Sequence, residues 1–188
     1  MAAIVLQADK IMVKPIEFKD LARLINDKLT VPRDPVEPSK RKTVATILEE
    51  ESLGTIQRWM SRVDKNIELK AIPMSVIERT SHLPMILKNI ITRLRETRDM
   101  EAPARCSPEA VQHGVVRYTQ GYTAPLIVQE SRILQVCIFE TIHRNLINVD
   151  FSLLLPDVML IADEVDAQLT QCIDGFLLMQ AARIATTA

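Results

Sequence analysis

The chain has 188 residues, a formal net charge of −1 at pH 7, and a composition that is 47% apolar but only 4% aromatic. This length fits one domain, or one domain with an appended arm, and the near-neutral charge lacks the basic excess of nucleic-acid-binding proteins. The low content of glycine and aromatic residues disfavours a strand-rich fold, whereas the abundant Leu, Ile, Ala, Met, Glu and Arg all occur readily in helices. An all-α protein without a nucleic-acid partner is expected.

The first helix is predicted over residues 16–29, whose apolar residues recur at spacings of three and four and therefore share one face: Phe18, Leu21, Leu24, Ile25 and Leu29. Pro32, Pro35 and Pro38 follow, and proline cannot continue a helix. We therefore expect residues 1–40 to be a helical arm with a proline-rich connector, which packs on the core or on a partner chain. Residues 41–188 are expected to form the helical domain.

Within that domain the helical pattern resumes over residues 41–66, where Gly54 is a candidate bend and Trp59 a candidate core residue. Ser75 and Glu78 have the spacing of a capping box, which opens a short helix. A second helix is expected to begin at Pro84, because proline is tolerated at the first helical position, and to run to about residue 98.

The second half of the domain is predicted to contain three helices. One starts at Pro108 and ends near Gly121, the next is capped by Thr123, and the last begins near Pro156 and runs toward residue 183. Together these elements predict a bundle of six or seven helices, with a globin-like arrangement as the variant.

The cysteines Cys106, Cys137 and Cys172 are far apart and form no Cys-x-x-Cys pair, so neither a zinc site nor a disulfide framework is indicated. The first residues lack the features of a secretory signal, and no stretch approaches the ~20 uninterrupted apolar residues of a membrane helix. We expect a cytoplasmic protein with no membrane-spanning segment.

Motifs for catalysis or cofactor binding are absent from the sequence. It contains no phosphate loop, no glycine-rich dinucleotide turn and no Gly-x-Ser-x-Gly elbow. The histidines His82, His113 and His143 fall in separate predicted helices with no His or Cys at ligand spacing, so no metal site is predicted. We expect neither a cofactor nor an enzymatic activity.

The stretch from His113 to Glu130 carries the most distinctive polar pattern. His113, Arg117 and Gly121 are four residues apart, so they align along a helix that ends at the glycine. If the next helix forms an antiparallel hairpin with this one, Glu130 folds back near Arg117 or His113. The cluster is then either a hydrogen-bonded structural pin between two helices or the lining of a ligand pocket.

This stretch, read as H-x3-R-x3-G-Y followed by Leu126 and Glu130, resembles the N-terminal domain of the RsbT co-antagonist family. The upstream helix with Trp59 and the His82-Leu83-Pro84 segment resemble it too, so that the likeness covers roughly residues 44–180. Ser131 and Gln135 depart from the residues common in that family.

The resemblance implies a bacterial sensory domain found at the front of stressosome-type regulators and of some sensor histidine kinases. Such a domain is usually a homodimer, and its last helix passes a conformational change to a kinase or a STAS-type regulator. The chain is then either a free-standing input module or the front of a longer signalling protein. The alternative is a small-molecule or tetrapyrrole-binding protein, with a pocket of ~300–1,000 Å³ near His113, Arg117 and Glu130.

Overall fold

The computed structural model describes residues 14–30, 41–96 and 107–187. In these ranges the elements are helices joined by short turns and loops, and there is no strand; Lys42 and Val149 form an isolated β-bridge. The predicted all-α class is confirmed. No helix in the described part of the chain is long and apolar enough to cross a membrane.

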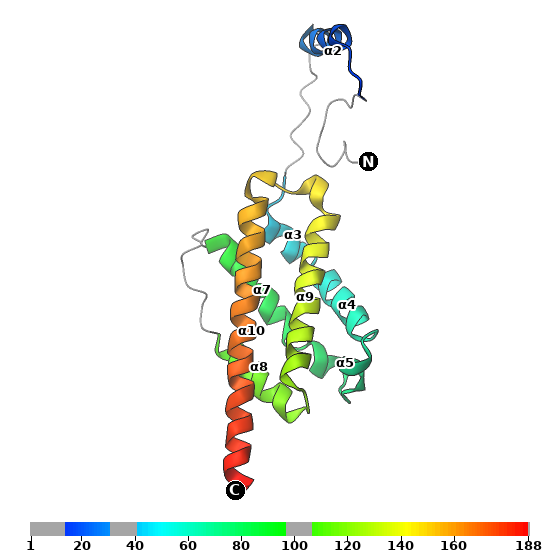
Figure 1. Ribbon diagram of the computed structural model, residues 1–188. Coiled ribbons are helices and arrows are strands. Elements are labelled where there is room, and N and C mark those ends of the chain that lie inside the picture. Colours follow the sequence, from blue (N-terminus) through cyan, green and yellow to red (C-terminus); the bar gives the residue numbers. More distant parts are fainter. Residues whose placement is uncertain (1–13, 31–40, 97–106, 188) are drawn as a thin grey trace.

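The bundle contains six helices of seven residues or more, within the predicted range, together with two single-turn helices. The described elements are, in chain order, α2 (Phe18–Thr30), α3 (Val44–Glu50), α4 (Ser52–Val63), α5 (Ile67–Ala71), α6 (Val76–Thr80), α7 (Leu83–Glu96), α8 (Pro108–Thr119), α9 (Ala124–Arg144), a 3₁₀ turn (Leu146–Asn148) and α10 (Phe151–Thr187). The two longest, α9 and α10, run antiparallel, and α8 lies against α10 near its C-terminal half (Figure 1).

Three helix boundaries differ from or sharpen the predictions. The predicted helix over residues 41–66 divides into α3 and α4 at Glu51, whereas Gly54 lies inside α4. The capping box of Ser75 and Glu78 is formed in both directions and starts α6. The last helix begins at Phe151 rather than near Pro156, because the Asp150 carboxylate accepts the N–H of Ser152 at 3.0 Å and so caps the chain earlier.

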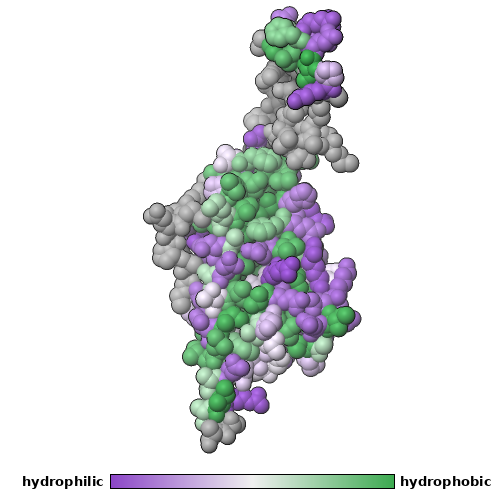
Figure 2. Space-filling view, in the orientation of Figure 1, coloured by the Kyte–Doolittle hydropathy of each residue, from purple (hydrophilic) through white to green (hydrophobic). Residues whose placement is uncertain are grey.

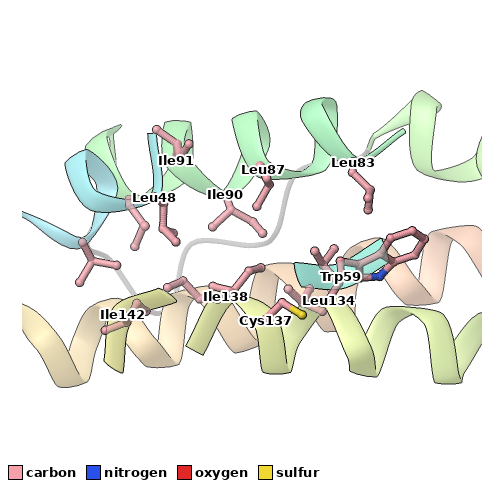
Figure 3. Packing of buried hydrophobic residues seen from close by; sticks show 14 of the residues in the cluster. Leu48, Trp59, Leu83, Leu87, Ile90, Ile91, Leu134, Cys137, Ile138 and Ile142 are labelled. Atoms are coloured by element: carbon pink, nitrogen blue, oxygen red, sulfur yellow. The ribbon is translucent and has the colours of Figure 1, made fainter. Parts of the chain in front are cut away.

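The core lies between α7 and α9, with α3, α4 and α10 closing it. Leu83, Leu87 and Ile90 of α7 point toward a facing row of α9 that includes Leu134, Ile138 and Ile142, and Trp59 fills one end of this layer (Figure 3). Trp59 is completely buried, as expected of a core residue. Cys137 and Cys172 are buried free thiols, and Cys106 lies outside the described residues.

Two glycines allow α8 and α10 to touch backbone to backbone. A Cβ atom built on Gly114 would lie 1.8 Å from the carbonyl oxygen of Cys172, and one on Gly175 would lie 2.1 Å from that of Val111. Any larger side chain would overlap these oxygens. The close crossing of α8 and α10 therefore requires glycine, which has no Cβ atom, at both positions.

Three apolar residues of the arm helix α2, Phe18, Leu21 and Ile25, are 85%, 38% and 51% exposed. That the arm packs on the core or on a partner chain stays a prediction. The rest of the predicted arm, residues 1–13 and 31–40, lies outside the described residues.

Candidate functional site

The helix pair α8–α9 carries a buried ion pair between Arg117 and Glu130. The guanidinium donates from Nε to Oε2 at 2.9 Å and from Nη2 to Oε1 at 2.8 Å. The two side chains are only 1% and 4% exposed. The pair is bidentate, which fixes both distance and orientation.

The turn at Gly121 brings these two side chains together. Gly121 has φ +83°, a left-handed conformation that favours glycine. The N–H of Tyr122 donates to the carbonyl of Arg117 at 3.0 Å, and the N–H of Gly121 to that of Tyr118 at 3.1 Å. This is the Schellman pattern, and it ends α8 and turns the chain into α9, on which Glu130 meets Arg117.

Arg117 also binds groups from elsewhere in the fold. Its Nη1 donates to Oε1 of Gln120 at 2.8 Å, and its Nη2 donates to the backbone carbonyl of Arg79 at 3.3 Å. The guanidinium carbon lies 4.7 Å from the centre of the Tyr122 ring, a cation–π distance. The Arg117 side chain thereby connects Arg79 with the segment 120–130.

A second buried cation, Arg79, joins the site. Its guanidinium donates to the carbonyls of Leu69 and Ile72 at 3.0 and 2.8 Å, and to the Tyr122 hydroxyl at 3.3 Å. That hydroxyl lies 3.2 Å from Oε1 of Glu130. Burial and, to a smaller extent, the neighbouring carboxylate of Glu130 raise the pKa of Tyr122 to about 12, so it stays a protonated phenol.

Two histidines stack beside the ion pair. The ring centres of His82 and His113 are 3.9 Å apart with an interplanar angle of 20°, and Trp59 meets His82 edge-on at 6.0 Å. Burial is the main cause that holds the pKa of His82 well below 6.5, and the nearby His113 and Arg117 add to it. Burial also lowers the pKa of His113, although Glu130 partly opposes it. Both imidazoles are therefore neutral at pH 7.

We refer to these six side chains as the polar cluster: Arg79, His82, His113, Arg117, Tyr122 and Glu130. The structure brings together His113, Arg117 and Glu130, the three residues singled out in the sequence, and places Gly121 at their turn. His82, Arg79 and Tyr122 were not assigned to a site. They come from the turn before α7, the one-turn helix α6 and the turn after Gly121, and no spacing in the sequence indicates that these three side chains meet.

One side of the polar cluster faces a cavity of about 90 Å³ between α4, α7, α8, α9 and α10. His82, His113 and Glu130 line it, whereas Arg117 does not. The remaining wall is mostly apolar and includes Trp59, Ile86, Leu134, Val165, Leu169 and Cys172. This volume is smaller than the ~300–1,000 Å³ of typical pockets for drug-sized ligands.

His82, His113 and Glu130 also bring three potential metal-ligand atoms within 4.8 Å of one another. A shared ion needs the in-plane lone pairs of both imidazoles to converge at about 2.0–2.1 Å, and two nearly parallel stacked rings do not direct them to one point. Glu130 in addition accepts from Arg117 with both oxygens. As arranged, these residues fit a hydrogen-bonded cluster better than a metal site.

The cluster also lacks the arrangement of a nucleophile and its base. Burial raises the pKa of Cys172 to about 12, so the thiol that lines the cavity stays protonated and is a poor nucleophile. Glu130 is already engaged by Arg117 and Tyr122, whereas a general base needs a lone pair directed at a substrate proton.

Comparison of the chain with protein-family models, with curated proteins and with solved structures finds no match. Membership of the RsbT co-antagonist family, and the globin-like variant of the bundle, therefore both stay predictions.

Proposed function

We propose that this chain is a non-enzymatic bacterial signalling input domain, which senses a ligand or partner and relays it through dimerisation and its C-terminal helix. The observation that carries the proposal is that the cavity is walled on one side by α10 itself, through Val165, Leu169 and Cys172. A molecule that enters the cavity would therefore press directly on the helix that ends the domain.

The relay is supported by the shape of α10. This helix has 37 residues, and its C-terminal turns extend beyond the rest of the bundle (Figure 1). Leu177 and Leu178 on these turns are 48% and 66% exposed. A packed helix that shifts between two discrete positions carries a local change along its length, and these turns would present that change to a kinase or a STAS-type regulator.

Dimerisation is supported by an exposed apolar stripe at the other end of α10. Phe151, Leu155 and Met159 follow one another at intervals of four residues and are 37%, 69% and 49% exposed, and Ile147 precedes them at 57%. Apolar surface gathers at this end of the bundle (Figure 2). Contiguous exposed apolar patches typically mark interaction sites, and a second copy of the chain would cover this one.

Sedimentation equilibrium tests the dimer. We expect the wild-type chain to be a dimer, and Leu155→Glu to dissociate it, because burying a carboxylate without a partner is strongly unfavourable. Leu178→Glu makes the same change at the opposite end of the same helix and should leave the dimer intact. A wild-type chain that stays monomeric at high concentration would contradict the proposal.

The alternative function, a small-molecule-binding protein in its own right, is favoured by the cavity alone. A volume of about 90 Å³ supports a small ligand and not a tetrapyrrole. It predicts that ligand occupancy leaves the oligomeric state and α10 unchanged. Amide hydrogen exchange along α10 distinguishes the two functions, since a relay requires altered protection beyond the cavity wall.

A further inference from the structure

The polar end of the cavity has a gap that fits one hydrogen-bonding atom. Nε2 of His113 and Oε2 of Glu130 lie 3.9 Å apart, which is too far for a direct hydrogen bond. Both side chains line the cavity. An oxygen placed about 2.8 Å from each would bridge them, provided that it donates to the carboxylate and accepts from the imidazole. A hydroxyl group does both.

The charge at this end favours a neutral ligand. Arg117 balances the carboxylate of Glu130, and the lowered pKa values of His82 and His113 keep both rings uncharged. Arg79 is a further buried cation, but it is not part of the cavity wall and its guanidinium donates to two carbonyls and to Tyr122. A charged ligand at this end would lose its hydration and meet only a carboxylate that Arg117 already balances, because the other carboxylate of the wall, Glu109, is exposed to solvent.

The volume of the cavity and its apolar walls determine which hydrocarbon group the ligand can carry. An engineered apolar cavity of roughly 150 Å³ holds benzene, so about 90 Å³ holds a smaller body. Leu134, Val165 and Leu169 supply the apolar contacts. Met85 and Glu109 are exposed members of the same wall, so the cavity reaches solvent on their side.

We propose that this cavity binds a small neutral alcohol, whose hydroxyl bridges His113 and Glu130 and whose short hydrocarbon chain packs against Leu134, Val165 and Leu169. The proposal names the ligand class of the sensory site, and to that extent it rests on the proposed function.

Trp59 provides a built-in reporter for the test. It is the only tryptophan of the chain, its ring lines the cavity, and its Nε1 donates to the carbonyl of Glu130 at 3.2 Å. Its single indole N–H resonance is followed in ¹H–¹⁵N spectra while the wild-type protein is titrated with butan-1-ol, pentane, butylammonium or butanoate. These probes have similar chains and differ in the terminal group.

We expect butan-1-ol to shift the indole resonance saturably and to bind at least roughly tenfold more tightly than the other three, because a hydroxyl between a carboxylate and an imidazole gains a charge-assisted hydrogen bond. Ala110→Leu, which fills the cavity, should weaken binding of butan-1-ol by at least about tenfold. Ala182→Leu makes the same change on an exposed turn of α10 and should bind as the wild type does.

Equal binding of pentane would overturn the hydroxyl bridge, and tighter binding of butanoate or butylammonium would overturn the neutral ligand. No saturable shift with any probe would overturn the site itself. The dimer measurement separates this inference from the proposed function. A dimer that depends on Leu155 but shows no alcohol binding refutes only the ligand class, whereas alcohol binding to a strict monomer refutes the relay.

Discussion

Every nitrogen of the Arg117 guanidinium donates a hydrogen bond, to Glu130, Gln120 and the carbonyl of Arg79. With 1% of its side chain exposed, this residue has no access to water as a substitute partner. The role of each member of the polar cluster therefore depends on the others, and removing one leaves a buried group unsatisfied.

Arg117→Ala and Glu130→Ala should each lower the free energy of unfolding by about 3–5 kcal/mol, because each leaves an uncompensated buried charge. Urea denaturation measures the loss. The double variant Arg117→Met, Glu130→Leu should lose much less than the sum, since the guanidinium and the carboxylate that pair with each other are removed together.

Arg95→Ala is the matched control, because Arg95 pairs with Glu49 on the surface with both side chains about half exposed. It should leave the urea midpoint nearly unchanged. Equal losses for Arg95→Ala and Arg117→Ala would contradict a structural role for the buried pair.

The histidine pair predicts an acid-sensitive fold. Because folding lowers the pKa of His82 and His113 below 6.5, the unfolded chain binds more protons below that pH. Their contribution is present above pH 6.5 and is lost as the pH falls, by up to about 1.4 kcal/mol per pH unit for each histidine. Three side chains face the two histidines: Trp59, Arg117 and Glu130. The positive charge of Arg117 opposes protonation of the imidazoles, and the carboxylate of Glu130 partly offsets this effect at His113.

The measurement is the free energy of unfolding between pH 7 and pH 5, above the range in which carboxylates titrate. His82→Phe should reduce the slope, and His143→Phe, at an exposed site at the end of α9, should retain it. A flat profile for the wild type would show that the pair is not kept neutral by burial.

At the level of the elements, the contact between α8 and α10 positions the site. Gly114 immediately follows His113 in α8, and Gly175 lies one turn beyond Cys172 in α10. The close crossing therefore holds α8, which carries His113 and Arg117, against α10, which forms one wall of the cavity. The short approach leaves α10 little freedom to move away from α8. A shift of α10 would therefore occur about this crossing.

Gly114→Ala and Gly175→Ala should each destabilise the fold by about 1–3 kcal/mol or more, because the added methyl overlaps a backbone oxygen that cannot rotate away. Thermal unfolding followed by circular dichroism measures the effect. Gly54→Ala is the control: its Cβ would meet only the movable side chains of Glu51 and Arg58, and alanine favours a helix by about 1 kcal/mol. If all three variants melted alike, the crossing would not limit stability.

At the level of the whole molecule, the core is built without α2. Among the described residues the core draws its buried side chains from α3 onward, and Phe18, Leu21 and Ile25 of α2 are exposed. The packing of the described bundle therefore does not depend on α2.

Deletion of residues 1–40 should leave the melting temperature of the bundle within about 2–4 °C of the wild type, the shift that corresponds to roughly 1 kcal/mol for a chain of this size. The chain that starts at Arg41 keeps the bridge between Lys42 and Val149. A loss of dimer in the truncated chain with no change in melting would indicate an arm exchanged between subunits, whereas a large drop in melting would show that the arm packs on the core.

How much of this molecule the sequence determines depends on whether a feature is local. The all-α class, the capping box at Ser75 and the helix end at Gly121 follow from periodicity, side-chain hydrogen bonding and left-handed backbone geometry within a few residues. Contact of Glu130 with Arg117 or His113 is predicted only if the two helices form an antiparallel hairpin, so the choice of partner is not determined locally.

Tertiary structure alone decides the rest. Arg79 and His82 reach the cluster from α6 and from the turn before α7, and Gly114 meets α10 across about sixty residues of sequence. The cavity exists because side chains from five helices, α4 and α7 to α10, leave a space that no one helix encodes. Local bonding rules thus predict the helices and their ends. The site depends on packing, and packing depends on the shapes of residues that lie far apart in the chain.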